Sequence, residues 1–296
     1  MLKIKEILPE SIATKLRCLK YEITRNYNFK KYHNYKLCIS SPKTFNEKLY
    51  YRKYFGNQEF MADKADKYLV RDYVEKKVGK EILIPLLGCY DVIDESIWSN
   101  LPEKFVLKTN HGSGSDHIEI VKSKSESNKH LIIEKMNKAV RQSFGKLNHQ
   151  PFYDLIERKI LVEEYLETEK YTPDDYKFHV FKNEVFIQVD VGRYTEHKRS
   201  LYDVNWRKLD FKLNSKYDFA SKDKPENLDE MIAIARDLAE GYDYVRIDLY
   251  NVHGKIYFGE ITQTHGNGTE NFEPTSKDLE WGKLWILDKN NKNLYK

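Results

Sequence analysis

Residues 242–262 read "YDYVRIDLYNVHGKIYFGEIT", in which two runs of alternating apolar and polar residues flank a glycine turn. Such alternation is typical of an antiparallel hairpin with one apolar and one polar face. A three-residue loop ending at Gly254 would place Glu260 opposite Arg246, on the same face as Asp248, because glycine readily adopts the left-handed conformation of the last loop position. A two-residue turn would put Glu260 on the other face. The glycine favours the first register, in which Asp248 and Glu260 are diagonal neighbours.

Two carboxylates this close together repel each other unless a proton or a cation lies between them. Oxygen ligands of this kind suit Mg²⁺, which takes one or two protein carboxylates and completes its coordination with phosphate and water. From the hairpin alone, a surface ion pair in which Arg246 neutralises both carboxylates is the simpler interpretation. The hairpin therefore marks a candidate metal site that needs support from the rest of the chain.

A second hairpin is indicated upstream, where residues 105–121 read "FVLKTNHGSGSDHIEIV". An apolar, β-branched run ends at Lys108 and leads into a loop of glycine and serine before a second strand. Such a loop lets backbone N–H groups approach an anion where side chains would clash, and the lysine adds a compact positive charge. The loop is neither a Walker A motif nor a dinucleotide fingerprint, so a plain Gly/Ser turn beside an exposed lysine is the alternative.

The remaining segments alternate between helix and strand patterns. Three helices are predicted from apolar spacing and from glycine or proline near their ends: 63–79, about 128–144 and 225–241. Strands are predicted from β-branched and aromatic runs: 158–166, 175–181 and 185–193. The ends of the chain are expected to be helical: 1 to about 60 and about 275–287. This order of elements predicts an α+β fold.

The composition limits the classes of function. The 296 residues include 40% hydrophobic and 32% charged residues with a formal net charge of +4, which is globular and gives no reason to expect nucleic-acid binding. Three scattered cysteines suggest neither a disulfide framework nor a zinc site, so we expect a cytoplasmic protein. The basic N-terminal segment fits a helix packed on the domain, with peripheral contact with a membrane surface as the alternative.

Taken in chain order, these features resemble one known family. Lys67 near a helix start, Lys108 before the glycine loop, Lys177 on a strand and the final pair Asp248 and Glu260 follow one another as in the ATP-grasp superfamily. Within it, the chain is similar to the TupA-like group of bacterial surface-polysaccharide proteins over about 44–285. The motifs that carry this resemblance are "FNEKLYYRKYFG", "DKADKYLVRDYV", "VLKTNHGSG", "DYKFHVF", "HKRSLYD" and "YVRIDLYNVHGKIYFGEIT".

The resemblance implies a fold and a domain plan. The expected fold is the α+β ATP-grasp fold, in which two α+β subdomains grip ATP between them, with a helical N-terminal cap. We expect the cap at 1–60 and the ATP-grasp domain at 61–296. Within that domain, we expect a flap subdomain at about 105–163 and a metal-binding subdomain at about 164–287.

The resemblance also implies a nucleotide site. Lysines would bind phosphate oxygens as flexible point charges, while the loop 109–117 closes over them as a flap. The strand "VEEYL" would be the hinge that binds adenine through its backbone, with ordinary edge-strand polarity as the alternative. Glu163, Glu167 or Glu169 would reach the base or the ribose. The implied cofactor-binding residues are Lys67, Lys108, His111, Gly112, Ser113, Gly114, Glu163, Glu164, Tyr165 and Leu166.

Metal, catalytic and substrate residues follow from the same resemblance. Asp248 and Glu260 would hold Mg²⁺, but the superfamily usually has Asn two residues later, where this chain has the weaker ligand Thr262. The loop 264–274, "THGNGTENFEP", is the candidate acceptor pocket, with a solvated loop as the alternative. The implied catalytic residues, which would face the γ-phosphate and the carboxylate being activated, are Lys177, Arg193, Lys198 and Arg246. The implied substrate residues are His265, Asn267 and Glu270.

The implied activity is ATP-dependent ligation of a carboxylate to an amine through an acyl phosphate. The expected substrates are a uronic acid of a capsular or cell-wall polysaccharide, as in teichuronopeptide synthesis, and an amino acid or amino alcohol. Alternatives on the same scaffold are a kinase, a glycosyltransferase and a non-catalytic sugar-binding protein. The paired carboxylates argue against the last of these. The oligomeric state is not predicted.

Overall fold

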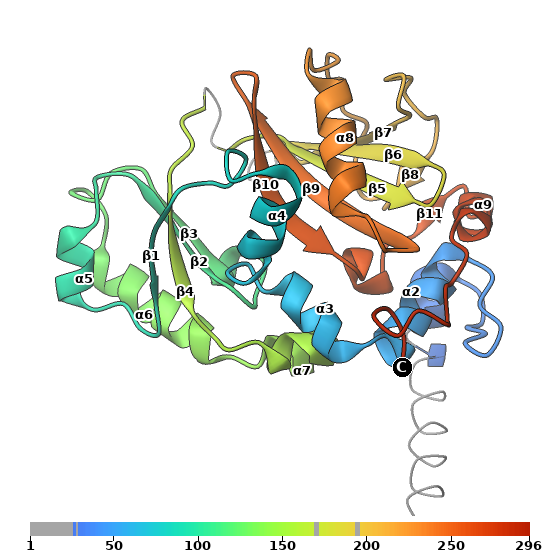
Figure 1. Cartoon of the computed structure of the whole chain (residues 1–296), viewed down its shortest axis with the longest axis horizontal. Helices are drawn as coiled ribbons and strands as arrows, with labels where there is room; N and C mark the ends of the chain where they lie inside the picture. Colours follow the sequence, from blue (N-terminus) through green and yellow to red (C-terminus); the bar gives the residue numbers. More distant parts are fainter. Residues whose placement is uncertain (1–25, 28, 169–171, 193–195) are drawn as a thin grey trace, which may run out of the picture.

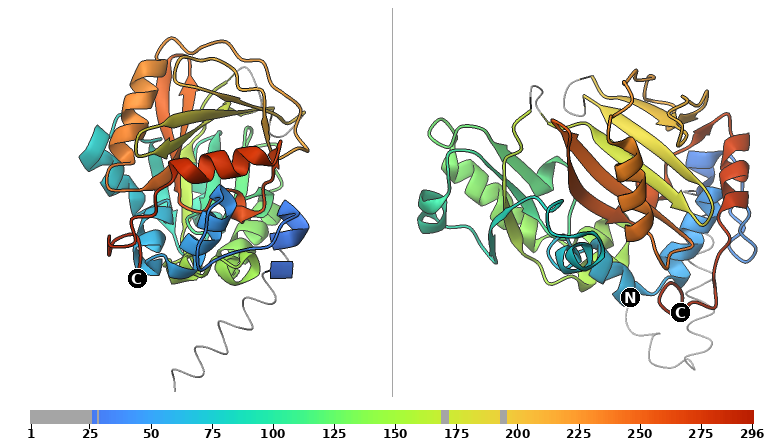
Figure 2. Two further views of the ribbon diagram at one scale, coloured as in Figure 1. Left: turned by 90° about the vertical axis from the view of Figure 1, so that its right-hand side faces the viewer. Right: turned by 45° about the horizontal axis from the view of Figure 1, so that its top comes forward.

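The computed structural model describes residues 26–27, 29–168, 172–192 and 196–296. Its main feature is two separate antiparallel sheets, one of four strands and one of five, with helices packed around them (Figure 1). The sheets lie side by side, as Figure 1 and the right-hand view of Figure 2 show. This architecture confirms the predicted α+β class.

The four-stranded sheet has the strand order β1-β4-β2-β3. Its strands are β1 (Leu86–Tyr90), β2 (Phe105–Thr109), β3 (Ile118–Val121) and β4 (Ile160–Glu164). Helices α5 (Glu95–Asn100) and α6 (Lys129–Arg141) belong to the same unit, and the apolar face of α6 packs through Met136 against Phe105 and Val162. The predicted strand, glycine loop and strand of 105–121 are confirmed, since β2 pairs with β3 from Phe105 to Lys108.

The five-stranded sheet has the order β10-β9-β5-β6-β7. Its strands are β5 (Asp175–Phe181), β6 (Val185–Val191), β7 (Lys198–Tyr202), β9 (Tyr244–Val252) and β10 (Lys255–Thr262). Helix α8 (Leu228–Leu238) covers one face, where Met231 and Leu238 pack against Phe178 and Ile247. Side chains alternate across a strand, so the polar residues of β5, β6 and β9 are collected on the opposite face.

The described part of the expected N-terminal cap packs into the core of the C-terminal half. Helix α2 (Phe45–Phe55) begins with a capping box between Thr44 and Glu47. Phe45 is fully buried and contacts the rings of Trp281 and Trp285, on and beside α9 (Ser276–Leu284). A short sheet of β8 (Lys212–Leu213) and β11 (Phe272–Glu273) lies in the same cluster. The proposed boundary at residue 60 therefore does not coincide with a break in packing.

The helix predicted over 63–79 is two helices, α3 (Gln58–Ala65) and α4 (Val70–Val78). Asp66 causes the interruption, because its carboxylate accepts hydrogen bonds from the backbone N–H groups of Tyr68 and Leu69. Gly79 ends α4 with a φ of 91°, as its position predicted. Short helices complete the chain: α7 (Phe144–Asn148), η1 (Ser115–His117), η2 (Pro151–Leu155) and η3 (His265–Gly268). No described helix has the length and apolar character needed to cross a bilayer.

The register predicted for the last hairpin was wrong. Asp248 and Glu260 do share one face, but they lie directly opposite each other and not diagonally. The loop has two residues, His253 and Gly254, with φ of 51° and 80°, so Val252 pairs with Lys255. This register alone would put Gly259 opposite Asp248. A bulge between Phe258 and Glu260 shifts the pairing by one residue and places Glu260 directly opposite Asp248.

Candidate active site

A cavity of about 600 Å³ opens between the two sheets. The four-stranded sheet lines it with Val106, Lys108 and Glu163, and the five-stranded sheet with the polar face of β5, β6, β9 and β10. A cavity of this size falls within the range of small-ligand sites. Most of the residues singled out in the sequence lie around it.

At one end, two lysines are held by acceptors that an anion can replace. The Lys67 ammonium donates to the carbonyl oxygen of Gly112 at 2.7 Å, and burial lowers its pKa. The Lys108 ammonium lies 2.5 Å from Glu163 Oε2. Both lysines line the cavity, so both are placed to bind a ligand anion.

The glycine loop lines this end with residues 112–115. A Cβ at Gly112 would lie 2.1 Å from His117 Nδ1, so the ring of His117 leaves no room for a side chain there. His117 also lines the cavity and lies 2.8 Å from Thr109 Oγ1. The loop is held against its own hairpin by this packing and by Lys67. Its predicted movement as a flap stays a prediction.

His111 is a correction to the predicted nucleotide-binding set. It is fully buried, its Nε2 donates to the carbonyl of Gln142 at 3.1 Å, and it does not line the cavity. Burial lowers the pKa of His111 to about 4, which keeps the ring neutral. The histidine that faces the cavity from this loop is His117.

The predicted hinge, Val162 to Leu166, lines the cavity with its last four residues. The backbone N–H of Glu164 donates to Pro85 O at 3.0 Å, so this particular group is already engaged. Of the three alternatives for a base or ribose contact, only Glu163 is placed at the cavity. Glu167 forms an exposed ion pair with Lys104, and Glu169 lies outside the described residues.

On the five-stranded sheet, Lys177 is the centre of a buried charge cluster. Its ammonium lies 3.2 Å from Asp175, 3.6 Å from Asp190 and 3.4 Å from Asp248. The sheet register explains this, because Lys177 on β5 pairs directly with Asp248 on β9, and Asp175 pairs with Asp190 on β6. The cluster places a cation among three carboxylates on the face that lines the cavity.

Arg246 joins the two predicted metal ligands. Its Nε and Nη2 donate to both oxygens of Asp248 at 2.6 Å, and Nη2 also donates to Glu260 at 2.9 Å. Thr262 accepts from the same Nη2 at 3.0 Å and donates to Glu260 at 2.9 Å. The ion pair considered from sequence is therefore present. It is buried, however, since Asp248 is 3% and Arg246 7% exposed, and it lines the cavity.

The charges around the carboxylates of Asp248 and Glu260 suit a divalent cation. Burial acts to raise the pKa of Glu260, but the charges of Lys67, Arg246 and Lys177 outweigh it and hold the pKa at about 2. Burial raises the pKa of Asp248 more than Arg246 and Lys177 lower it. No group of three or more potential ligands among His, Cys, Asp and Glu gathers around one point in the described ranges. The donor set, two carboxylates in register and one hydroxyl, suits Mg²⁺ that is bound together with phosphate oxygens.

Of the predicted catalytic residues, Lys198 needs correction, and Arg193 lies outside the described residues. Lys198 is half exposed, pairs with Glu196 and does not line the cavity. Its neighbour Arg199 faces the cavity instead, because successive residues of β7 point to opposite sides. Arg199 donates from Nε to Asp190 at 2.6 Å and from Nη1 to Glu270 at 2.9 Å.

The loop 264–274 is packed, so the solvated-loop alternative was wrong. His265 is 1% exposed and accepts from Arg246 Nη1 at 2.8 Å, with Nε2 2.6 Å from Glu270. Asn267 accepts from Lys53 at 2.6 Å and donates to Asn148 O at 2.8 Å. Glu270 and Asn267 line the cavity, whereas His265 lies behind it.

Further lining residues were not singled out from the sequence. They come from segments that the motifs do not connect: Ile84, Asn148, Gln150, Tyr153, His197, Arg199 and Tyr217. For Arg199, the alternation within "HKRSLYD" was a usable signal once β7 is recognised as a strand. For Asn148, Gln150 and Tyr153, the sequence carries no such signal, because α7 and η2 reach the cavity only through tertiary packing.

The comparisons with known proteins identify a family for the chain. The model of the TupA-like ATP-grasp family matches residues 47–286. No match to a curated protein was found. Among solved structures, the chain resembles the L-amino acid ligase from Bacillus licheniformis (TM-score 0.47, 11% identity, 80% of this chain and 52% of that one).

Two further solved structures are D-alanine–D-alanine ligases. The enzyme from Coxiella burnetii has a TM-score of 0.43 and 12% identity, over 81% of this chain and 64% of that one. The enzyme from Helicobacter pylori has a TM-score of 0.41 and 17% identity, over 76% of this chain and 62% of that one. This chain thus spans less than two thirds of the length of each of these three structures.

Proposed function

The chain belongs to the TupA-like ATP-grasp family, and from this we propose that it is an ATP-dependent ligase that joins a carboxylate to an amine. The observation that carries the proposal is one cavity that is lined by four cations and by two carboxylates paired directly across β9 and β10. The cations are Lys67, Lys108, Lys177 and Arg246, and the pair is Asp248 with Glu260.

The charges around the cavity suit polyphosphate bound with a divalent cation. Lys67 and Lys108 bind phosphate oxygens by exchanging their present acceptors, the Gly112 carbonyl and Glu163. Asp248 and Glu260, with Thr262 beside them, would hold Mg²⁺, which would neutralise phosphate charge and polarise the γ-phosphoryl group. The apolar side chains of Ile84, Val106 and Leu166 offer a surface for the adenine ring at the hinge.

The proposed reaction has two steps. A carboxylate oxygen of the first substrate attacks the γ-phosphorus of ATP, and ADP leaves, which gives an acyl phosphate. An amine then attacks the carbonyl carbon, phosphate leaves with the electron pair of the C–O bond, and the amine loses a proton. No protein nucleophile is required, and catalysis rests on alignment and on charge stabilisation worth several kcal/mol.

Specific roles follow for residues of the five-stranded sheet. Lys177 and Arg246 stabilise the transferred phosphoryl group, while Arg199, in place of Lys198, binds the carboxylate being activated. Glu270 and Asp190 hold the guanidinium of Arg199 from two sides, which fixes its direction. Glu270 and Asn267 line the end of the cavity proposed for the acceptor. The glycine loop acts as the flap that excludes water from the acyl phosphate.

The substrate identities are a finer part of the proposal. We propose a uronic acid carboxylate of a bacterial capsular or cell-wall polysaccharide, as in teichuronopeptide synthesis, and an amino acid or amino alcohol as the amine. The support is the resemblance to surface-polysaccharide proteins. A cytoplasmic location, peripheral association with a membrane-bound assembly machinery and the division into flap and metal-binding subdomains belong to the same proposal.

The test is a substrate matrix with Mg-ATP. Uronic acids and their glycosides are combined with amino acids and amino alcohols, and ADP, phosphate and product mass are followed together. Phosphate release that needs both substrates, with a product lighter than their sum by one water, supports the ligase. A phosphorylated product with no need for an amine indicates a kinase instead, and transfer from a nucleotide sugar without ATP indicates a glycosyltransferase. The Asp248→Asn variant serves as the inactive control.

A further inference from the structure

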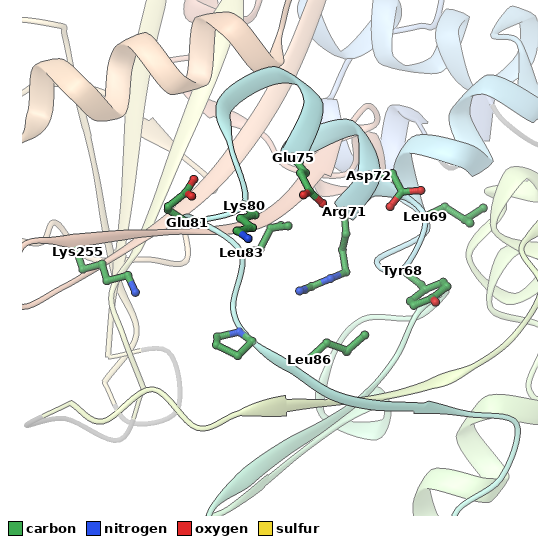
Figure 3. A pocket seen from close by; sticks show the side chains of 11 residues that line it. Tyr68, Leu69, Arg71, Asp72, Glu75, Lys80, Glu81, Leu83, Leu86 and Lys255 are labelled. Atoms are coloured by element: carbon green, nitrogen blue, oxygen red, sulfur yellow. The ribbon is translucent and has the colours of Figure 1, made fainter.

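A second cavity, of about 620 Å³, lies on the outer side of the segment that joins α4 to β1 (Figure 3). Leu83, Pro85 and Leu86 line this outer cavity, while Ile84 between them lines the cavity between the two sheets, the proposed ATP cavity. The two cavities are therefore separated by a single stretch of chain. That stretch is tied to both sheets, because Ile82 O accepts from Phe258 N at 2.7 Å and Pro85 O from Glu164 N at 3.0 Å.

The lining of the outer cavity combines charges of both signs with an apolar wall. Arg71, half-buried, extends from α4 into the middle of the cavity, below Glu75 and above Leu86 (Figure 3). The other charged lining residues are Asp72, Lys80, Glu81 and Lys255. Glu75 and Lys80 are exposed to water. In the ranges that the structure describes, neither takes part in an ion pair.

Arg71 also connects the two cavities chemically. Its Nη2 donates to Ile84 O at 2.9 Å, and its Nη1 lies 3.5 Å from Glu163 Oε1. The other oxygen of Glu163 lies 2.5 Å from the Lys108 ammonium in the ATP cavity. One buried carboxylate is thus shared by a cation of each cavity, and the contact with Arg71 is the longer of the two.

We propose that the outer cavity binds a small zwitterion, an α-amino acid with an apolar side chain, and that its occupancy weakens ATP binding. The ligand carboxylate pairs with Arg71 and Lys80, the ammonium with Glu75, and the side chain packs on Leu83 and Leu86. Three cations balance three carboxylates in the lining, and this balance favours a zwitterion over a simple anion or cation.

The direction of the coupling follows from the shared carboxylate. When the ligand carboxylate pairs with Arg71, Glu163 loses that partner and pairs with Lys108 alone. The stronger pair with Glu163 then keeps Lys108 from binding phosphate. Thermodynamic linkage requires ATP to weaken binding of the amino acid by the same factor. The binding part of this proposal is independent of the proposed function, whereas the coupling part rests on ATP as the ligand of the cavity between the two sheets.

The binding test uses L-leucine with two truncated probes, isovalerate without the ammonium and isoamylamine without the carboxylate. Calorimetry on the full chain should show L-leucine binding about tenfold tighter than either probe. Glu75→Gln and Lys80→Gln should each weaken it about tenfold. Lys76→Gln, an exposed residue of α4 that does not line the cavity, is the matched control. Equal binding of all three probes, or equal effects of Lys80→Gln and Lys76→Gln, would overturn the proposal.

The coupling test measures ATP affinity without and with saturating L-leucine. We expect ATP affinity to fall about fivefold or more, the lower range of allosteric coupling. Arg71→Lys keeps the positive charge, but a single ammonium group cannot contact Ile84 O and Glu163 together as the two guanidinium nitrogens do. This variant should therefore abolish the coupling while ATP still binds. ATP affinity that L-leucine leaves unchanged would overturn the coupling. If ATP does not bind at all, the proposed function fails, while the leucine titration still decides the outer site.

Discussion

The two sheets hold their charged side chains in different ways. On the four-stranded sheet, Lys108 pairs with Glu163 across adjacent strands, and Glu163 has one further and longer contact, with Arg71 at 3.5 Å. On the five-stranded sheet, Lys177 is shared by three carboxylates, and Arg246 donates to Asp248, Glu260 and Thr262. The first arrangement is an ion pair that a ligand can open, and the second is a network that keeps its geometry.

The difference has an energetic meaning. Removing one member of a buried network leaves an uncompensated charge in a low dielectric, which costs several kcal/mol, whereas opening one pair for an incoming phosphate exchanges one partner for another. Under the proposed function, the four-stranded sheet would be the part that responds to the nucleotide, and the five-stranded sheet would be the preorganised reaction centre. Four predictions test this comparison.

The largest effect is expected from Asp248→Asn on the five-stranded sheet. Loss of this carboxylate removes a proposed metal ligand and a partner of both Arg246 and Lys177, so turnover should fall by about 10³-fold or more. Glu260→Gln should behave in the same way. The measurement is steady-state ADP release, with thermal unfolding as a check on the fold. Near-normal rates in both variants would rule out the metal assignment.

The next effect compares two neighbours on β7. Arg199→Gln should lower kcat/KM by about 10²-fold, because the cavity loses the cation proposed for the substrate carboxylate. Lys198→Gln is the matched control and should stay within about twofold, as expected for an exposed pair. Equal losses in the two variants would mean that the assignment of the cavity-facing residue is wrong.

A smaller effect is expected on the four-stranded sheet. Lys108→Ala should weaken ATP binding by about tenfold, since a charge-assisted contact to phosphate is lost and Glu163 is left facing the ligand. The double variant with Glu163→Gln should recover part of this loss, because the unpaired carboxylate is neutralised. Calorimetry with a non-hydrolysable ATP analogue measures both. A double variant weaker than Lys108→Ala would contradict the exchange of partners.

The smallest effect concerns pH and stability. His111 has a pKa of about 4 in the folded chain, against about 6.5 in the unfolded chain. Between these two pH values the unfolded state binds more protons, so the free energy of unfolding decreases as the pH falls from about 6.5 to about 4. At about pH 5.5, the wild type should have lost about 1 kcal/mol relative to about pH 8 from this residue. His111→Asn should lack this component. Urea unfolding of both chains at the two pH values measures it, and identical pH dependence would refute it.

Several features were predictable from the sequence because they depend on local periodicity and local turns. Alternation predicted the last hairpin, and the strand, glycine loop and strand of 105–121 followed from a β-branched run that ends at glycine and serine. Helix α8 follows from its apolar spacing and from Gly241 beyond its end. The order of the motifs was enough to identify the ATP-grasp family.

Other features depend on how strands pair, which local pattern does not encode. The bulge at Gly259 changed which residue lies opposite Asp248. Of two adjacent basic residues, the pairing of β6 with β7 made Arg199 the one that faces the cavity, and packing made His117, in place of His111, the histidine at the glycine loop.

The sequence by itself determined the classes of element, the chemistry of the loop and hairpin, and the family. Only the tertiary structure decided which cation pairs with which carboxylate, that His265 lies behind Arg246, and that Glu163 pairs with one cation of each cavity. The physical reason is the sequence distance over which each effect acts. Periodicity and turn chemistry act over a few residues, whereas a buried ion pair is selected by desolvation and by contacts between segments that lie far apart along the chain.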